Sequence, residues 1–266
     1  DGLGNDFVIF DKRKEFISLT KKQIIKISDR KNIGCDQVIF IDKDKNSDAL
    51  VQFYNSDGNE IAACGNGSRC VAYLLMEENK NNQVAFRTKA GILNADLINK
   101  NLVSINMGVP NFEWNKIPLL KKMDNKNLKI KIYDQKDKIF EGGFALSIGN
   151  PHIIFFVDNL DDFDLKKIGP KIEKHNYFPE KCNVTFANIK NKKKIVVKVW
   201  ERGAGLTKAC GTAACATVVA AAILNLSDRC ANIHFIEGSL NINWKLNNNI
   251  YMTGKVSEIK PIKINI

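Results

Sequence analysis

The chain of 266 residues lacks several features that would assign it to a class at once. No apolar run reaches the roughly 18 residues needed to cross a bilayer, and the stretch 218–226 is far too short. No basic-then-apolar signal segment opens the sequence either, so we expect a cytoplasmic protein without a membrane partner. The sequence begins at Asp1, inside what looks like an opening strand, so we expect that a few residues precede it.

Metal-ligand and disulfide patterns are also missing. The three histidines have no ligand spacing to the cysteines, and no C-x2-C pair occurs. Seven cysteines are an odd number, which makes a disulfide framework a poor expectation for a chain without a signal segment. The sequence therefore predicts no metal site and at least some reduced thiols.

The charge has one dominant sign, with a net value of +11. Such a charge can indicate a nucleic-acid partner. Here the lysines are scattered through asparagine-rich loops, as at 121–126 and 190–194, without interleaved aromatic residues. We therefore expect a solvated lysine-rich surface and no nucleic-acid partner, on a globular protein of one large or two smaller domains.

What the sequence does have is a long-period repeat. The phrase Ala-Cys-Gly occurs twice, and Cys64 and Cys210 are 146 positions apart. Shifts of 145 to 147 also bring five further pairs into register, namely Asn5 with Asn150, Gln37 with Asn183, Asn55 with Glu201, Gly91 with Gly238 and Gly108 with Gly254. Agreement across the chain predicts two homologous halves.

Each half shows the same order of elements. Short β-branched runs at 7–10, 38–41 and 50–54 predict strands. The stretches 70–76 and 214–226 are almost uncharged, which is typical of a buried helix. We therefore predict an α+β fold of two halves, 1–110 and 111–255, each made of strands around one central helix. A C-terminal strand at 256–266 is expected to return to the first half, and the active site to lie in the cleft between the halves.

Both Ala-Cys-Gly phrases stand where these helices begin. A helix N-terminus carries unsatisfied N–H groups and partial positive charge, so it can bind a carboxylate and is expected to lower the pKa of a resident thiol. Inversion of an amino-acid α-carbon needs a base on one face and an acid on the other. Two such cysteines predict this reaction, with the N–H groups stabilising charge that develops on the carboxylate.

The segments GLGNDF, CDQ, FYNSDGNE, CGNGSRC, GNPH, CNV and ERGAG with ACGTAAC, in that order, resemble the diaminopimelate epimerase family. This resemblance spans almost the whole chain. It implies two halves related by a pseudo-twofold axis, each a strongly curved, mainly antiparallel sheet around a central buried helix. It also implies epimerisation of LL-2,6-diaminopimelate to the meso form, in lysine and peptidoglycan precursor synthesis, with no cofactor.

The same resemblance implies roles for individual residues. Cys64 and Cys210 become the two catalytic bases, and Gly65, Asn66, Gly211 and Thr212 bind the reacting carboxylate. Asn5, Asn55, Asn150, Asn183 and Arg202 hold the remote end of the substrate, with Arg202 as a bidentate clamp on its carboxylate. Glu201 faces the reacting amino group, Gln37 lies nearby, and His152 lines the site.

Two alternatives stay open from the sequence. One is a racemase of another small amino acid such as proline or hydroxyproline, against which the residues for a remote amino-acid group argue. The other is a redox-sensing or thiol-exchange module that uses the same two cysteines with a protein partner. The remaining cysteines are expected to pack in the interior, and a homodimer is left open as the assembly.

Overall fold

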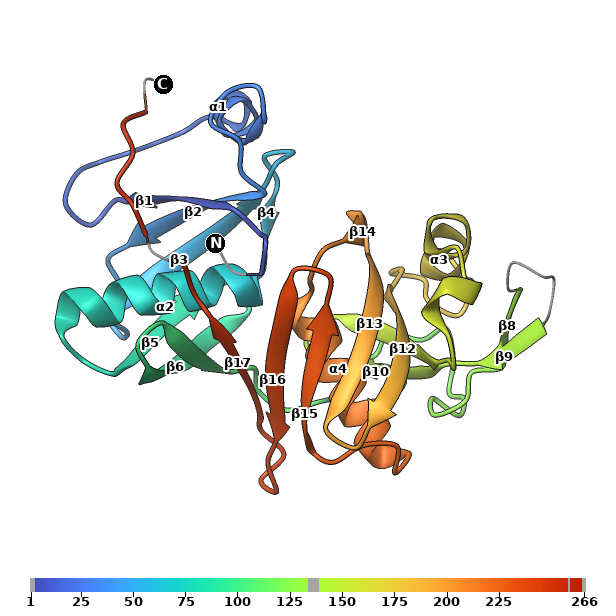
Figure 1. Ribbon diagram of the computed structural model, residues 1–266. Coiled ribbons are helices and arrows are strands. Elements are labelled where there is room, and N and C mark those ends of the chain that lie inside the picture. The colour runs from blue at the N-terminus through green and yellow to red at the C-terminus, as the bar shows by residue number, and fades with distance from the viewer. Residues whose placement is uncertain (1–2, 134–138, 258, 265–266) are drawn as a thin grey trace. The chain divides into compact units, whose positions relative to one another are not determined.

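The computed structural model describes residues 3–133, 139–257 and 259–264. It divides into two compact units (Figure 1). Unit 1 comprises Asp1–Asn106 and Thr253–Ile266, and unit 2 comprises Met107–Met252. Within the described ranges, no helix is both long and apolar enough to cross a membrane.

The order β-α-β-β-β-α-β-β-β of unit 1 recurs in unit 2 from β11 onward, after three additional strands, β8, β9 and β10. The helices are α1 Lys21–Ser28, α2 Gly65–Asn79, α3 Leu165–Glu173 and α4 Gly211–Ile223, with a 3-10 turn at Leu160–Asp162. The strands of the first part are β1 Phe7–Asp11, β2 Gln37–Asp42, β3 Ala49–Asn55, β4 Glu60–Ile61, β5 Gln83–Thr88, β6 Gly91–Asn99 and β7 Leu102–Asn106. Those that follow are β8 Ile130–Tyr133, β9 Ile139–Gly142, β10 Phe144–Ser147, β11 Pro151–Phe156, β12 Asn183–Asn191, β13 Lys194–Glu201, β14 Gly205–Thr207, β15 Cys230–Phe235, β16 Gly238–Trp244 and β17 Ile250–Lys255.

The sheet of unit 1 runs in the order β1-β2-β3-β5-β6-β7, with the short β4 paired to β3. The pairs β1–β2 and β3–β5 are parallel, and the others are antiparallel. Helix α2 packs against β2, β5, β6 and β7. Its Val71 and Leu75 are fully buried, so burial of an apolar helix against the sheet forms the core of this unit.

Unit 2 repeats this pairing pattern. The pairs β11–β12 and β13–β15 are parallel, β12–β13 and β15–β16 are antiparallel, and β14 pairs with β13 as β4 does with β3. Strand β10 adds to the edge of β11. Helix α4 packs against β10, β11, β12, β15 and β16, and its residues from Ala213 to Ala221 are buried. The α+β architecture expected from the sequence is confirmed.

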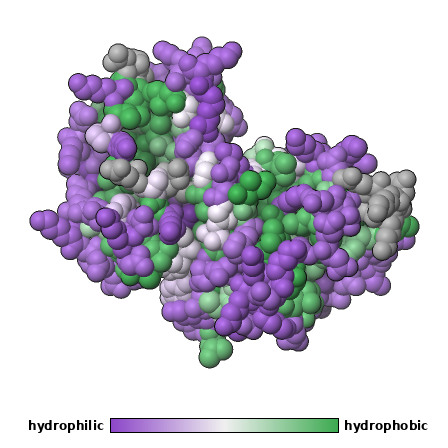
Figure 2. Space-filling model, in the orientation of Figure 1, coloured by the Kyte–Doolittle hydropathy of each residue, from purple (hydrophilic) through white to green (hydrophobic). Residues whose placement is uncertain are grey.

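A second cluster of apolar side chains lies between the sheet of unit 2, α3 and the hairpin of β8 and β9. Three aromatic rings form its centre, since Phe186 stacks on Phe155 with ring centroids 5.2 Å apart and meets Phe163 at 5.0 Å. The outer face is different in character. Hydrophilic residues cover much of the surface visible in Figure 2, as the lysine-rich composition led us to expect.

The C-terminal strand expected at 256–266 is not present among the described residues. The last strand, β17, ends at Lys255, and the described residues 256–257 and 259–264 form no strand. Pro261 stands in the middle of this stretch, and a proline has no N–H group to donate to a strand ladder. Residues 258, 265 and 266 of that expectation lie outside the described residues.

The aromatic cluster yields a test of the core of unit 2. Phe186→Ala removes the central ring and leaves a cavity, so the free energy of unfolding of unit 2 is expected to fall by about 3–5 kcal/mol. All three tryptophans, Trp114, Trp200 and Trp244, belong to unit 2, so urea unfolding followed by tryptophan fluorescence reports on this unit. The matched control Ile236→Ala, at an 85% exposed position, is expected to change it by less than about 0.5 kcal/mol. Equal effects of the two substitutions would contradict this account of the core.

Candidate active site

Cys64 is the N-cap residue of α2. Its backbone is extended, with φ −134° and ψ 117°, and its sulfur accepts a hydrogen bond from the N–H of Gly67 at 3.5 Å. Gly65 and Asn66 are the first two helical residues. Packing favours glycine at position 67, because an added Cβ would lie 3.0 Å from side-chain atoms of both Ile39 and Phe53 of the sheet, which is a tight contact. The first turn of α2 is therefore held close against β2 and β3.

Two pairs of amides accompany Cys64 in unit 1. Asn66 donates to the side-chain oxygen of Asn5 at 2.7 Å, which joins α2 to the segment before β1. Gln37 and Asn55 stand opposite each other where β2 begins and β3 ends, and Gln37 donates to Asn55 at 3.1 Å. The other Gln37 atom, Oε1, is buried and has no hydrogen-bond partner among the described residues. Unit 1 thus brings together all of its expected polar residues as two hydrogen-bonded pairs.

Cys210 is the N-cap residue of α4, with nearly the same backbone angles, φ −139° and ψ 116°. For Cys210, the expectation of a lowered thiol pKa is wrong. Burial raises the pKa of the Cys210 thiol well above its ordinary value, and the negative charge of Glu201 adds to the effect. The positive helix end is outweighed because the thiol is only 6% exposed and the negative charge of Glu201 acts on it. Burial also raises the pKa of Glu201.

A line of neutral side chains leads to the same sulfur. The Thr212 hydroxyl lies 3.5 Å from Cys210 Sγ, and Asn150 donates to Thr212 Oγ1 at 3.4 Å. His152 Nε2 lies 3.0 Å from Asn150 Oδ1 and, since an amide oxygen only accepts, this nitrogen carries the hydrogen. Burial, together with the charge of Arg202, lowers the pKa of His152 to about 3, so this imidazole is neutral at physiological pH.

Asn183, Glu201 and Arg202 lie where β12 begins and β13 ends. Asn183 accepts from the backbone N–H of Arg202 at 3.0 Å, and its amide donates to the carbonyl of Pro151 at 2.9 Å. The exposed guanidinium of Arg202 donates to the carbonyl of Glu180 at 3.1 Å. Unit 2 therefore gathers all of its expected residues around the two strand ends and the start of α4.

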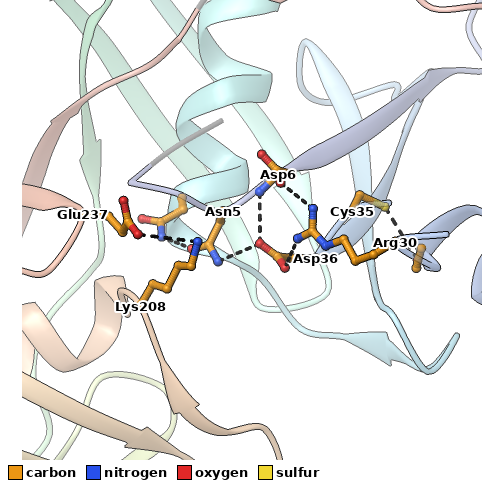
Figure 3. Close-up of polar contacts among 9 residues, drawn as sticks. Asn5, Asp6, Arg30, Cys35, Asp36, Lys208 and Glu237 are labelled. Atoms are coloured by element: carbon orange, nitrogen blue, oxygen red, sulfur yellow. Dashed lines mark hydrogen bonds and ion pairs between the residues drawn. The ribbon is translucent and has the colours of Figure 1, made fainter. Parts of the chain in front are cut away.

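Three supporting residues were not predicted from the sequence. The buried Glu173 of α3 accepts from the Trp200 indole at 2.7 Å and from the backbone N–H of Gly203 at 3.1 Å, and so fixes the loop that follows Arg202. Asp36 accepts from Asn5 at 3.2 Å (Figure 3), and Arg69 donates to Asn66 at 3.0 Å. None of the three falls on a repeated polar position, so the repeat gave no signal for them.

The arrangement offers two thiols, each at the start of a buried helix and each followed by polar side chains. A sulfur there can give or take a proton, and the adjacent N–H groups of a first helical turn can bind an anionic oxygen. Among the described residues, no group of three or more His, Cys, Asp or Glu side chains is placed to hold a metal ion.

A family model and relatives similar in sequence agree on one family. The family model for diaminopimelate epimerase matches residues 1–113 and 144–259. The chain is 55% identical over 266 residues to the diaminopimelate epimerase of Pelagibacter ubique, covering 100% of this chain and 97% of that protein. It is 44% identical to the diaminopimelate epimerase of Phenylobacterium zucineum, with coverage of 96% and 92%.

Among solved structures, the chain is similar to a phenazine biosynthesis protein of the PhzF family from Bacillus anthracis. The TM-score is 0.68 at 17% sequence identity, and the match covers 99% of this chain and 94% of the other. At this identity the likeness concerns the fold alone.

The raised pKa of Cys210 can be tested by removing its neighbouring charge. In Glu201→Gln the thiolate no longer faces a carboxylate, so the pH at which Cys210 ionises is expected to move down. Thiolate absorbance at 240 nm, taken as the difference from a Cys210→Ala protein, measures it. The control is Glu237→Gln in the same unit, because Glu237 instead faces Lys208 at 3.6 Å (Figure 3) and is expected to leave the midpoint unchanged. An upward or absent shift in Glu201→Gln would overturn the assignment.

Proposed function

Because the chain belongs to the diaminopimelate epimerase family, we propose that it inverts one α-carbon of LL-2,6-diaminopimelate to give the meso form, in lysine and peptidoglycan precursor synthesis. One observation supports the chemistry above all. Cys64 and Cys210 are N-cap residues of two buried helices, in units whose strands pair in the same pattern. The proposed reaction needs no cofactor.

In this proposal one cysteine is a thiolate and the other a thiol. The thiolate takes the α-proton, so the Cα–H bond breaks and its electron pair moves toward the carboxylate. The thiol then delivers its proton to the opposite face of the α-carbon, and a new Cα–H bond forms. The two sulfurs have exchanged protonation states, and proton exchange with solvent restores them. Cys210, whose pKa is raised, is suited to begin as the thiol.

The free energy barrier lies mainly in the weak acidity of the α-proton. Fixed dipoles that face the carboxylate as it gains charge can lower that barrier. We assign this task to the first-turn groups of both helices, at Gly65 and Asn66 of α2 and Gly211 and Thr212 of α4. These positions are the first two helical residues after each N-cap, so their N–H groups are among those that no residue of the helix itself satisfies.

The polar residues at the strand ends are assigned to the rest of the substrate. Glu201 is placed against the reacting amino group, and Gln37 and His152 line the site. The remote amino-acid group is assigned to Asn5, Asn55, Asn150, Asn183 and Arg202. A guanidinium at Arg202 suits a carboxylate because it can donate two parallel hydrogen bonds.

The proposal has one substrate molecule bound by residues of both units. It also places the enzyme in the cytoplasm, acting on a small molecule and not on nucleic acid. Sedimentation of the purified protein decides between a monomer and a homodimer.

Replacement of either cysteine tests the two-base reaction. In Cys64→Ala and in Cys210→Ala one face lacks its proton carrier, so epimerisation is expected to fall by at least about 10³-fold. Chiral chromatography of LL- and meso-diaminopimelate measures it, and the parent enzyme in D2O is expected to place deuterium on the α-carbon. The control is Cys70→Ala, a buried cysteine of α2 that is expected to affect stability more than kcat. Epimerisation that survives Cys210→Ala would refute the mechanism.

The role of Arg202 tests substrate choice. Arg202→Ala is expected to lower kcat/KM for diaminopimelate by about 10- to 100-fold, since a charged hydrogen-bonded contact is lost. Arg202→Lys keeps the charge but not the planar fork of donors. Its kcat/KM is expected to lie between that of the parent enzyme and that of Arg202→Ala. A panel that adds proline and hydroxyproline identifies the competing racemase activity. Turnover of those amino acids above that of diaminopimelate would replace the proposed substrate.

A further inference from the structure

Four side chains of unit 1 form a continuous line of hydrogen bonds. Arg69 donates to Asn66 Oδ1 at 3.0 Å, and Asn66 Nδ2 donates to Asn5 Oδ1 at 2.7 Å. Asn5 Nδ2 then donates to Asp36 Oδ2 at 3.2 Å. The line joins a fully buried cation on α2 to a carboxylate directly before β2, and it passes through two of the amides assigned to the substrate.

The two ends of this line determine the orientation of the amides between them. A guanidinium can only donate hydrogen bonds, and an ionised carboxylate can only accept them. Asn66 must therefore turn its oxygen toward Arg69, and Asn5 must turn its nitrogen toward Asp36. The line uses one N–H of each amide group. Each amide therefore has a second N–H that the line does not use. The position of the nitrogen that carries it is set by Arg69 at one end and Asp36 at the other.

Asp36 is itself held from three sides. The backbone N–H of Asp6 donates to its Oδ2 at 3.0 Å, and Arg30 donates to its Oδ1 at 2.6 Å (Figure 3). Arg30 also donates to Asp6 Oδ2 at 2.6 Å. Side chains in these ion pairs are 37–57% exposed, and such exposed pairs contribute little to stability. The Asp36 carboxylate is therefore better explained by the orientation it gives the Asn5 amide than by a contribution to the stability of the fold.

We propose that Asp36 is a positioning residue, which holds the amides of Asn5 and Asn66 with their nitrogens correctly turned for the carboxylate oxygens of the substrate. This inference rests on the proposed epimerase function. Asp36 acts through Asn5 and does not touch the substrate. Its requirement is an acceptor oxygen toward Asn5, and neither the negative charge nor the ion pair with Arg30 is essential.

The decisive variants are Asp36→Ala and Asp36→Asn. Asp36→Ala removes the acceptor, so the Asn5 amide can turn over, and kcat is expected to fall about tenfold with KM changed less than about twofold. Asp36→Asn keeps an oxygen that can face Asn5 and is expected to recover kcat to within about threefold of the parent. Rates are expressed per folded protein, measured by circular dichroism.

Two further proteins separate orientation from stability. Arg30→Ala breaks the ion pairs but leaves the Asp36 carboxylate, and it is expected to keep kcat within about twofold. Asn5→Ala removes the group through which Asp36 acts. Adding Asp36→Ala to Asn5→Ala is therefore expected to lower kcat further by less than about twofold, whereas independent effects would multiply.

Several results would overturn the inference while the parent enzyme epimerises diaminopimelate normally. They are an unchanged kcat in Asp36→Ala, a loss in Asp36→Asn as large as that in Asp36→Ala, or multiplied losses in the double variant. A parent enzyme that fails to epimerise diaminopimelate refutes the proposed function instead. Failure of the inference is thus measured on the variants, and failure of the proposed function on the parent enzyme.

Discussion

The burial of α2 and α4 is the constraint on which the rest of the structure depends. A helix packed against its own sheet leaves the N–H groups of its first turn without helical partners, and those groups need an acceptor. The Cys64 sulfur supplies a weak one to Gly67. Cys210 makes no side-chain cap, so it leaves more of the first turn unused. The same burial that makes these ends good anion sites also makes a thiolate there costly.

At Cys210 these opposing effects can be ranked. The helix end favours the thiolate by a partial charge, whereas loss of solvent and a full charge on Glu201 both oppose it. The result is a thiol that keeps its proton. A cysteine of this kind is a poor base by itself, so the proposed reaction depends on the order of events at the substrate and on stabilisation of the developing carboxylate charge by fixed N–H groups.

Much of the fold, and the placement of the candidate site residues at helix starts and strand ends, could be predicted from the sequence because these features recur in its two halves. The uncharged stretches after Cys64 and Cys210 predict buried helices, and the strand-end residues reappear at a shift near 146. The expected C-terminal strand is absent from the described residues 256–257 and 259–264, where Pro261 has no N–H group for a strand ladder. The expected lowering of the thiol pKa was wrong for another reason. That pKa depends on the burial of Cys210 and on the nearby charge of Glu201, and a sequence gives neither burial nor distances.

The supporting residues could not be found from the repeat because the two units do not share them. At the shift of 146, Asp36 corresponds to Cys182, Arg69 to Cys215, and Glu173 to Ile27. Most positions assigned to the reaction thus correspond between the units, with Arg202 and His152 as exceptions, whereas the residues that orient them do not. Unit 1 uses charged ends on a line of amides, and unit 2 uses a neutral histidine and a threonine.

This difference has a chemical consequence for the proposed pair of bases. The position equivalent to Glu201, at the end of β3, is the neutral Asn55. A carboxylate at one strand end and an amide at the other means that only Cys210 has a negative charge at this position, which favours its thiol form. A two-base epimerase needs one thiol and one thiolate at the same time, and two identical environments would leave the proton without a preferred site. In the proposed reaction, the carboxylate near Cys210 therefore favours the starting state in which Cys210 carries the proton.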